Sequence, residues 1–185
     1  MQFTLTDLQN EIKENSNKLL KENIDLLETI QKVDDNCRID KKVWDLVIDQ
    51  GWLALDVPEE DGGLGFSNTD TSILSEVLGY YMPIIPIFSS GIVFKHILMN
   101  SKKEKKDALL PEIISGEKIG TFAVYESDKY EINQDTINTQ LTSVDSGYIL
   151  SGNKKYILFG DVSDYIAVLA KHEDRFKFVL VSSDS

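Results

Sequence analysis

The sequence predicts an α+β fold, with an N-terminal α-helical domain over residues 1–117 followed by part of an antiparallel β domain over residues 118–185. Apolar residues recur at helical spacing throughout the first range. From Ile119 onward the pattern changes to alternation of period two and to short apolar runs, which are separated by turn signals at residues 145–147 and 152–153. Because this alternation still runs at residues 176–181, we expect the β domain to be incomplete.

Apolar residues spaced seven apart mark the N-terminal helices. They are Leu5, Ile12, Leu19, Leu26 and Val33. Thr6 and Gln9 have the spacing of a capping box at the start of this stripe. A coiled coil is the alternative for such a repeat, but its second seam would carry Asn15, Glu22 and Thr29, which would leave it unpacked. We therefore expect amphipathic helices that dock on a bundle.

Capping residues predict where the other helices begin and end. Asp40 precedes a short apolar helix that Gly51 ends, because glycine readily takes the left-handed conformation found there. Ser67 opens a helix that stops at Gly79. Further helices are expected over residues 92–98 and from a capping box at Ser101 and Glu104 to residues 115–116.

Six strands are expected after residue 118. They cover residues 120–125, 136–142, 148–150, 156–159, 165–170 and 176–181. Each is a short run in which apolar residues alternate with polar ones or follow one another directly, as in half-buried or buried strands.

Composition and charge exclude several classes of function. The 185 residues carry a formal net charge of −12, so the chain lacks the basic footprint that nucleic acid or an anionic membrane surface requires. An acidic, solvated surface explains this charge without a special partner. The most apolar region, residues 82–99, is interrupted by two prolines and carries Lys95 and His96, which makes it too polar to span a bilayer. We expect neither nucleic-acid binding nor membrane insertion.

The few cysteine and histidine residues predict no metal centre. Cys37 is the single cysteine and has no partner for an internal disulfide. His96 and His172 stand alone, without cysteine or carboxylate ligands at metal-binding spacing. The N-terminus also lacks the basic start and the apolar stretch of a secretory signal. These features predict a cytoplasmic protein without a metal site.

Glycines at positions 62, 63 and 65 have two interpretations. Such a cluster can cradle a phosphate, but no Lys-Ser/Thr pair follows it, and the acids at positions 59–61 would repel an anion. A loop whose glycines set its shape is favoured. The basic run over residues 102–106 is similarly interpreted as a solvated helix face.

Three stretches match one family in order. They read GWLALDVPEEDGGLG at 51–65, LPEIISGEKIG at 110–120 and YILSGNKKYI at 148–157. They resemble signatures of the acyl-CoA dehydrogenase family. The resemblance implies an FAD-dependent flavoprotein that removes α and β hydrogens from an acyl thioester of coenzyme A or of an acyl carrier protein. Because the expected β domain is incomplete and its last strand would present an open edge, we also expect a homo- or hetero-oligomer.

The resemblance implies cofactor contacts at the start of the β domain. The family's motif of an aromatic residue, two variable residues and Thr-Glu-Pro falls on residues 122–127. Phe122, Val124 and Tyr125 inherit its backbone contacts to the flavin, and Tyr125 stands where the family has threonine. An ordinary core strand is the alternative interpretation of this run.

A second family motif, Gly-x-Lys-x-Trp-Ile-Thr, falls on residues 152–158. Tyr156 replaces the tryptophan that packs on the flavin and retains a ring that can stack. Leu158 replaces the threonine that hydrogen-bonds the cofactor. The lost hydroxyl removes about 0.5 to 1.5 kcal/mol of binding.

Two departures from the family oppose a self-sufficient enzyme. Residues 128–131 replace the family's glycine-rich turn, and Glu131 at about 6 Å from a cofactor pyrophosphate would cost roughly 2 to 3 kcal/mol. The glutamate that removes the α-proton lies in the family's C-terminal domain and has no counterpart here. We therefore expect weak or absent FAD binding, no catalytic residue, and catalysis only within a larger assembly. The alternative is a noncatalytic, degenerate subunit that pairs with a catalytic homologue.

Overall fold

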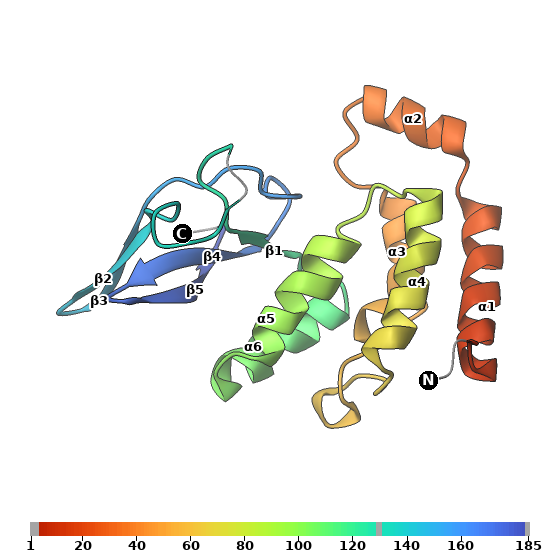
Figure 1. The fold of residues 1–185 in the computed structure, drawn as a ribbon. Helices are drawn as coiled ribbons and strands as arrows, with labels where there is room; N and C mark the ends of the chain where they lie inside the picture. The colour runs from red at the N-terminus through yellow and green to blue at the C-terminus, as the bar shows by residue number, and fades with distance from the viewer. Residues whose placement is uncertain (1–3, 129–130, 184–185) are drawn as a thin grey trace. The chain divides into compact units, whose positions relative to one another are not determined.

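The computed structural model describes residues 4–128 and 131–183 (Figure 1). The chain divides into two compact units, one formed by Met1–Ile85 with Ile114–Gly116 and the other by Pro86–Ile113 with Glu117–Ser185. The helical segments between residues 86 and 113 therefore belong to the unit that contains the strands. The domain boundary at residues 117 and 118 follows the sequence pattern and stays a prediction.

The first unit is helical. Its elements are α1 (Asp7–Asn23), α2 (Leu26–Asp34), α3 (Lys41–Asp49), η1 (Trp52–Ala54), η2 (Glu59–Asp61) and α4 (Asn68–Tyr81). Helices α1 and α4 lie side by side (Figure 1). The predicted capping box of Thr6 and Gln9 is confirmed, as are the caps Asp40 and Ser67. Helix α4 continues two residues beyond Gly79, the predicted end.

The seven-residue stripe does not form one buried face. Asp25 caps α2 separately, so the stripe is divided between two helices. The apolar side chains of α2, at positions 26, 27, 30 and 33, are each at least half exposed. Leu20, which lies off the stripe, is fully buried instead. The expected docking on a bundle therefore holds for α1 but not for the apolar face of α2.

The glycine-rich loop folds back on its own backbone. The amides of residues 62–66 all donate to main-chain carbonyls between Ala54 and Glu59. Gly63 allows a close approach, because a Cβ there would lie 2.1 Å from the carbonyl oxygen of Val57. With these amides already bonded, the loop has none of them to offer a phosphate, in agreement with the shape-setting interpretation.

The second unit combines helices with a five-stranded sheet. Its helical elements are η3 (Ile87–Phe94), α5 (Lys95–Met99) and α6 (Lys103–Ile114). Its strands are β1 (Gly120–Ala123), β2 (Gln140–Val144), β3 (Gly147–Ser151), β4 (Tyr165–His172) and β5 (Arg175–Ser182). Segment η3 is a π-helix, an uncommon form, and with α5 it contains the helix predicted at residues 92–98.

The sheet is mixed, which corrects the expected purely antiparallel arrangement. The pairs β2–β3 and β4–β5 are antiparallel, whereas β1 runs parallel to β4 with Gly120 opposite Tyr165. Strand β2 touches β4 through one parallel pair, Gln140 with Lys171. Parallel pairing requires a long crossover, and the chain between β1 and β4 supplies it. The α+β fold class is confirmed.

The strand predicted at residues 156–159 is wrong. Tyr156 and Phe159 have positive φ angles of 57° and 54°, which are incompatible with a strand. The predicted strand at 120–125 likewise ends at Ala123, and the one at 136–142 begins only at Gln140. Before Gln140, the amides of Asn138 and Thr139 donate to the Glu126 carboxylate instead of to a neighbouring strand.

Two apolar clusters form the core of the second unit. Phe94, Leu98, Ile113 and Ala167 form the first, and Val124, Ile137 and Leu169 form the second. Phe122 packs against both clusters. The helices and the loop after β1 thus share one sheet as their packing partner.

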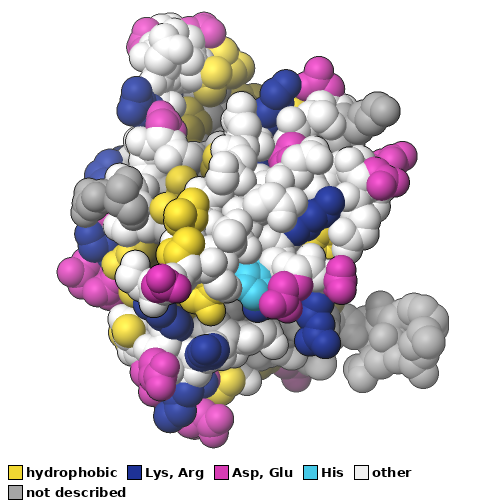
Figure 2. Space-filling model, turned by 90° about the vertical axis from the view of Figure 1, so that its left-hand side faces the viewer, with side chains coloured by type: hydrophobic (Ala, Val, Ile, Leu, Met, Phe, Trp, Pro, Cys, Tyr) yellow, Lys and Arg dark blue, Asp and Glu magenta, His cyan; other side chains and the backbone are white. Residues whose placement is uncertain are grey.

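Figure 2 shows acidic and basic side chains interspersed on one face of the surface. The net charge of −12 is therefore not gathered into a single field on that face. Among the described residues, no helix combines the length and the apolar character needed to cross a membrane.

Candidate functional site

The structure brings the two predicted motifs together at the end of β1. Phe122 lies in β1, Val124 and Tyr125 follow it, and Tyr156 and Leu158 lie in the segment between β3 and β4. The amide of Lys155 donates to the Tyr125 carbonyl oxygen over 2.8 Å. The Thr121 hydroxyl donates to the Leu158 carbonyl oxygen over 2.6 Å. All five predicted contact residues therefore belong to one local structure.

These five side chains divide into core and surface. Val124 is buried. Phe122 is partly buried, packs against the core and meets the ring of Phe88 edge to face, with centroids 6.2 Å apart. Tyr156 and Leu158 are 57% and 50% exposed. Val124 can therefore contribute only main-chain atoms to a ligand, whereas Tyr156 and Leu158 present side chains.

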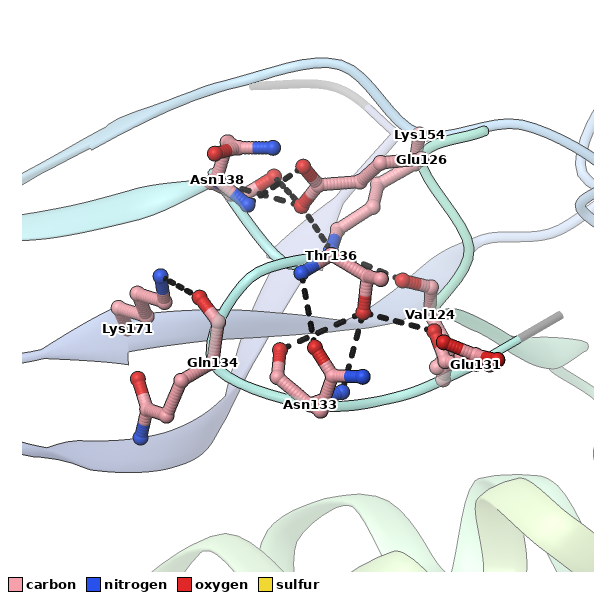
Figure 3. A network of polar contacts seen from close by, with 10 residues as sticks. Val124, Glu126, Glu131, Asn133, Gln134, Thr136, Asn138, Lys154 and Lys171 are labelled. Atoms are coloured by element: carbon pink, nitrogen blue, oxygen red, sulfur yellow. Dashed lines mark hydrogen bonds and ion pairs between the residues drawn. The ribbon is translucent and has the colours of Figure 1, made fainter. Parts of the chain in front are cut away.

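Lys154, two residues before Tyr156, takes part in a buried ion pair. Lys154 Nζ is 2.7 Å from Glu126 Oε1, and the two side chains are only 6% and 8% exposed. Lys154 Nζ also donates to the Val124 carbonyl oxygen over 3.1 Å (Figure 3). A buried charge is costly unless it is paired and hydrogen-bonded, and both conditions are met here.

Glu126 accepts further hydrogen bonds from the segment before β2. The amide of Asn138 donates to Oε2 over 2.6 Å, and the amide and hydroxyl of Thr139 donate to Oε1 over 2.9 and 2.6 Å. Burial by itself raises the pKa of Glu126, but the bonds from Lys154 and Thr139 outweigh it and lower that pKa to about 2. Glu126 is therefore a fixed carboxylate at neutral pH.

Gly152 allows this arrangement to form. A Cβ at this position would lie 2.3 Å from Thr139 Oγ1 and 2.7 Å from Thr139 Cα. The motif Gly-x-Lys thus has a physical explanation within this chain. Glycine lets the backbone pass Thr139, and the lysine two residues later reaches the carboxylate that Thr139 holds.

Tyr156 is tied to the segment that replaces the family's glycine turn. Its hydroxyl donates to Asp128 Oδ1 over 2.5 Å, and Lys155 Nζ lies 3.5 Å from the same oxygen. The bond from Tyr156 is the main cause that lowers the pKa of Asp128. Residues 129 and 130 of this segment lie outside the described residues.

Glu131 begins a short loop that is closed by its own polar groups. Its carbonyl oxygen accepts from the Thr136 hydroxyl over 2.7 Å, and Asn133 Oδ1 accepts from the amides of residues 135 and 136 (Figure 3). The Lys171 ammonium donates to the Gln134 carbonyl oxygen (Figure 3). The Glu131 side chain is exposed. Its predicted repulsion of a cofactor pyrophosphate stays a prediction.

The histidines lie away from these residues. His96 Nδ1, in α5, is 2.9 Å from the carbonyl oxygen of Ile92 in the preceding segment η3. His172 lies on the sheet. Its Nε2 is 3.2 Å from Ser143 Oγ, and its Nδ1 is 3.2 Å from Lys177 Nζ. Over residues 4–128 and 131–183, no group of three or more His, Cys, Asp or Glu side chains could hold a metal ion.

A hollow of about 560 Å³ occurs in the helical unit. Residues of α1 and of the glycine-rich loop line it, among them Ile12, Leu19, Trp52 and Phe66. It contains none of the predicted contact residues. No local pattern predicts this hollow, because its lining combines α1 with residues between Gln50 and Leu74.

Sequence reasoning also missed the role of Glu126 and Lys154. Charged residues are ordinarily exposed, so nothing in either local pattern marks them as buried. The usable signal was that both stand at fixed positions of the two matched motifs.

Residues 6–117 match the family model for the N-terminal domain of acyl-CoA dehydrogenases. A 2-methylacyl-CoA dehydrogenase from Solanum tuberosum is 28% identical over 90% of this chain and 41% of its own length. The chain spans less than half the length of the curated relatives that it matches.

Solved structures give the same fold. The ChsE4-ChsE5 complex from Mycobacterium tuberculosis has a TM-score of 0.86 at 23% identity, over 99% of this chain and 49% of that chain. The structure of PigA with FAD and proline has a TM-score of 0.81 at 22% identity, over 99% and 50%. With a family model that covers most of the chain and a fold that agrees over its whole length, this chain belongs to the acyl-CoA dehydrogenase family.

Proposed function

We propose that this chain is part of an FAD-dependent flavoprotein that removes α and β hydrogens from an acyl thioester, and that it works within a larger assembly. The observation that carries the proposal is the exposed pair Tyr156 and Leu158, held beside the end of β1 by two hydrogen bonds. Two comparisons support the proposal: a relative named as a 2-methylacyl-CoA dehydrogenase, and the structure of PigA with FAD and proline, which has the same fold.

The described residues fit the ring system of a flavin. An exposed tyrosine ring offers a face for stacking, and the neighbouring leucine offers apolar surface that excludes water. Bound FAD would supply the acceptor for a hydride from the substrate. Phe122, Val124 and Tyr125 would then line the ring's edge with main-chain atoms, since the Val124 side chain is buried and the Phe122 side chain packs against the core.

No described residue is proposed as the base that removes the α-proton. Glu126 is unsuitable, because its carboxylate is bonded to Lys154 and Thr139 and its pKa of about 2 leaves it without affinity for a proton at neutral pH. We place the base outside these 185 residues, in the same assembly. The acyl carrier is coenzyme A or an acyl carrier protein, and the location is the cytoplasm.

Titration of FAD with the purified chain tests the proposal. Flavin fluorescence should fall on binding, weakly in the wild type and less still in Tyr156→Ala and Leu158→Ala. Tyr148→Ala is the matched control, because Tyr148 is another exposed tyrosine, on β3, at 66% exposure against 57% for Tyr156. Quenching that is unaffected by the changes at 156 and 158, or equally affected by the change at 148, would refute a flavin site here.

A second candidate is a noncatalytic subunit that pairs with a catalytic homologue. It is favoured by the hydrogen bond from Tyr156 to Asp128, which engages the ring's hydroxyl with an acidic side chain, and by the missing hydroxyl at Leu158. The existence of a two-protein family structure, the ChsE4-ChsE5 complex, is in keeping with it. A colourless protein that gains flavin absorbance only with a partner chain supports this candidate, and stoichiometric flavin in the isolated chain excludes it.

A further inference from the structure

The segment that carries Tyr156 is fastened to β1 and its extension on both sides of that residue. Before it, the Lys155 amide bonds to the Tyr125 carbonyl oxygen over 2.8 Å. After it, the Leu158 carbonyl oxygen accepts from the Thr121 hydroxyl over 2.6 Å. Lys154 adds a charged and buried contact, to Glu126 and to the Val124 carbonyl oxygen.

This ion pair is too deeply buried to act on a ligand itself. Its side chains are 6% and 8% exposed, and both oxygens of Glu126 accept hydrogen bonds from the protein. Lys154 donates to two acceptors, both of them protein oxygens. Any effect of the pair on a bound molecule must therefore pass through the residues that it holds in place.

Tyr156 is in a conformation that its surroundings must impose. Its φ angle of 57° lies in the left-handed region, which residues other than glycine seldom adopt. The ion pair with Glu126 fixes Lys154, two positions before Tyr156. Glu126 in turn accepts hydrogen bonds from Thr139, in the segment before β2. Three chain segments thus meet at this ion pair, two residues along the chain from an exposed aromatic ring.

We propose that the Lys154–Glu126 pair positions the Tyr156 ring, and so sets the geometry of the surface on which a flavin would stack. Lys154 and Glu126 are positioning residues, and neither touches the ligand. That the ligand is a flavin rests on the proposed function. The orientation of the ring itself does not, and it can be observed without any ligand.

The experiment uses the full chain labelled with 3-fluorotyrosine, and Tyr156→Phe identifies the Tyr156 signal in the ¹⁹F NMR spectrum. The test variants are Lys154→Met and Glu126→Gln. Lys118→Met is the matched control, because it removes a less buried ion pair, with Asp164 at 2.9 Å, that lies before β1 rather than after it. Each variant is also titrated with FAD, and its thermal midpoint is recorded.

The proposal expects the Tyr156 signal to shift and broaden in both test variants and FAD affinity to fall about tenfold. Lys118→Met should lower the thermal midpoint without either change. An unmoved Tyr156 signal in Lys154→Met overturns the proposal, and so does an equal shift in Lys118→Met, which would show that any loss of stability moves the ring. Should the isolated wild type bind no FAD, a flavin site formed by this chain alone is refuted, and the fluorine signals alone decide the positioning role.

A milder variant covers the case in which the ion-pair variants do not fold. Thr139→Val removes the hydroxyl that donates to Glu126 over 2.6 Å and keeps the shape of the buried side chain. It should shift the Tyr156 signal in the same direction by a smaller amount. No shift in folded Thr139→Val would contradict the proposal as well.

Discussion

Gln9 Nε2 donates to Asp70 Oδ1 over 3.0 Å and so joins the capping boxes of two helices that lie 61 residues apart in sequence. Gln9 is the third residue of α1, and Asp70 is the third residue of α4. Each side chain also bonds back to its own cap, Gln9 to the Thr6 amide and Asp70 to the Ser67 amide. The N-terminal ends of α1 and α4 are therefore stabilised together.

Removing either partner should destabilise the helical unit. Asp70→Ala leaves the Ser67 amide and the Gln9 side chain without their acceptor, so we expect the free energy of unfolding to fall by about 2 kcal/mol. Gln9→Ala should cost about 1 kcal/mol. Urea unfolding followed by tryptophan fluorescence reports on this unit, because Trp44 and Trp52 both belong to it. Gln31→Ala, at an exposed glutamine bonded to Asp35, should change little.

Acid should weaken the strand-containing unit through Glu126. Its pKa in the folded chain, about 2, lies below the ordinary 4.5, so the ionised carboxylate stabilises the fold above pH 4.5 and this contribution disappears as the pH falls toward 2. The difference corresponds to about 3 kcal/mol. The loss of stability can be measured by hydrogen-exchange mass spectrometry of peptides from residues 120–182. The exchange is followed between pH 6 and pH 2.5 and corrected for intrinsic rates. In Glu126→Gln this pH dependence should be reduced, and in Glu76→Gln, at an exposed glutamate, it should match the wild type.

Gly152 and Gly79 should respond in opposite ways to alanine. Gly152→Ala forces a Cβ against Thr139, at 2.3 Å from Oγ1, and should destabilise the second unit by about 1 to 3 kcal/mol. Gly79 lies within α4 with no atom within 4 Å of an added Cβ, so Gly79→Ala should stabilise by about 0.5 to 1 kcal/mol. Thermal unfolding of the two variants should show a lower midpoint than the wild type for Gly152→Ala and a higher one for Gly79→Ala. A neutral Gly152→Ala would mean that the segment can move away from Thr139.

Leu158→Thr restores the hydroxyl that family members have at this position. Leu158 is half exposed, so the change removes little buried apolar surface. If the FAD site is where we propose, one added hydrogen bond should tighten FAD binding about two- to tenfold. Fluorescence titration measures the change, and Val144→Thr, at an exposed β2 residue, is the control. Equal affinities in Leu158→Thr and the wild type would argue for the noncatalytic subunit.

Local signals predicted the helix ends, because caps act within a few residues of the chain. Thr6, Asp40 and Ser67 each accept a hydrogen bond from an amide three residues later, as their sequence patterns indicated. The end of α4 was less predictable. A glycine in a helix costs only about 1 kcal/mol, and the helix continues through Gly79 to Tyr81.

Tertiary contacts explain what the sequence could not show. The apolar run from Tyr156 to Phe159 has the composition of a strand, but its positive φ angles depend on contacts with Thr121 and Tyr125 far away in sequence. The pairing of Glu126 with Lys154 joins residues 28 positions apart. Five site residues were named through the family resemblance, and they do lie together, but nothing in the sequence distinguished the buried Val124 from the exposed Tyr156.

The parallel pairing of β1 with β4 also has a consequence for the order of folding. Two-residue turns join β2 to β3 and β4 to β5, so each pair can form a local hairpin quickly. The pairing of β1 with β4, which places Gly120 opposite Tyr165, is non-local. It forms slowly because a long loop has to close first. On a ribosome, Thr121 and Phe122 emerge long before their partners on β4 exist. The surface around Tyr156, which depends on Thr121 and Tyr125, is therefore expected to be among the last parts of the nascent chain to form.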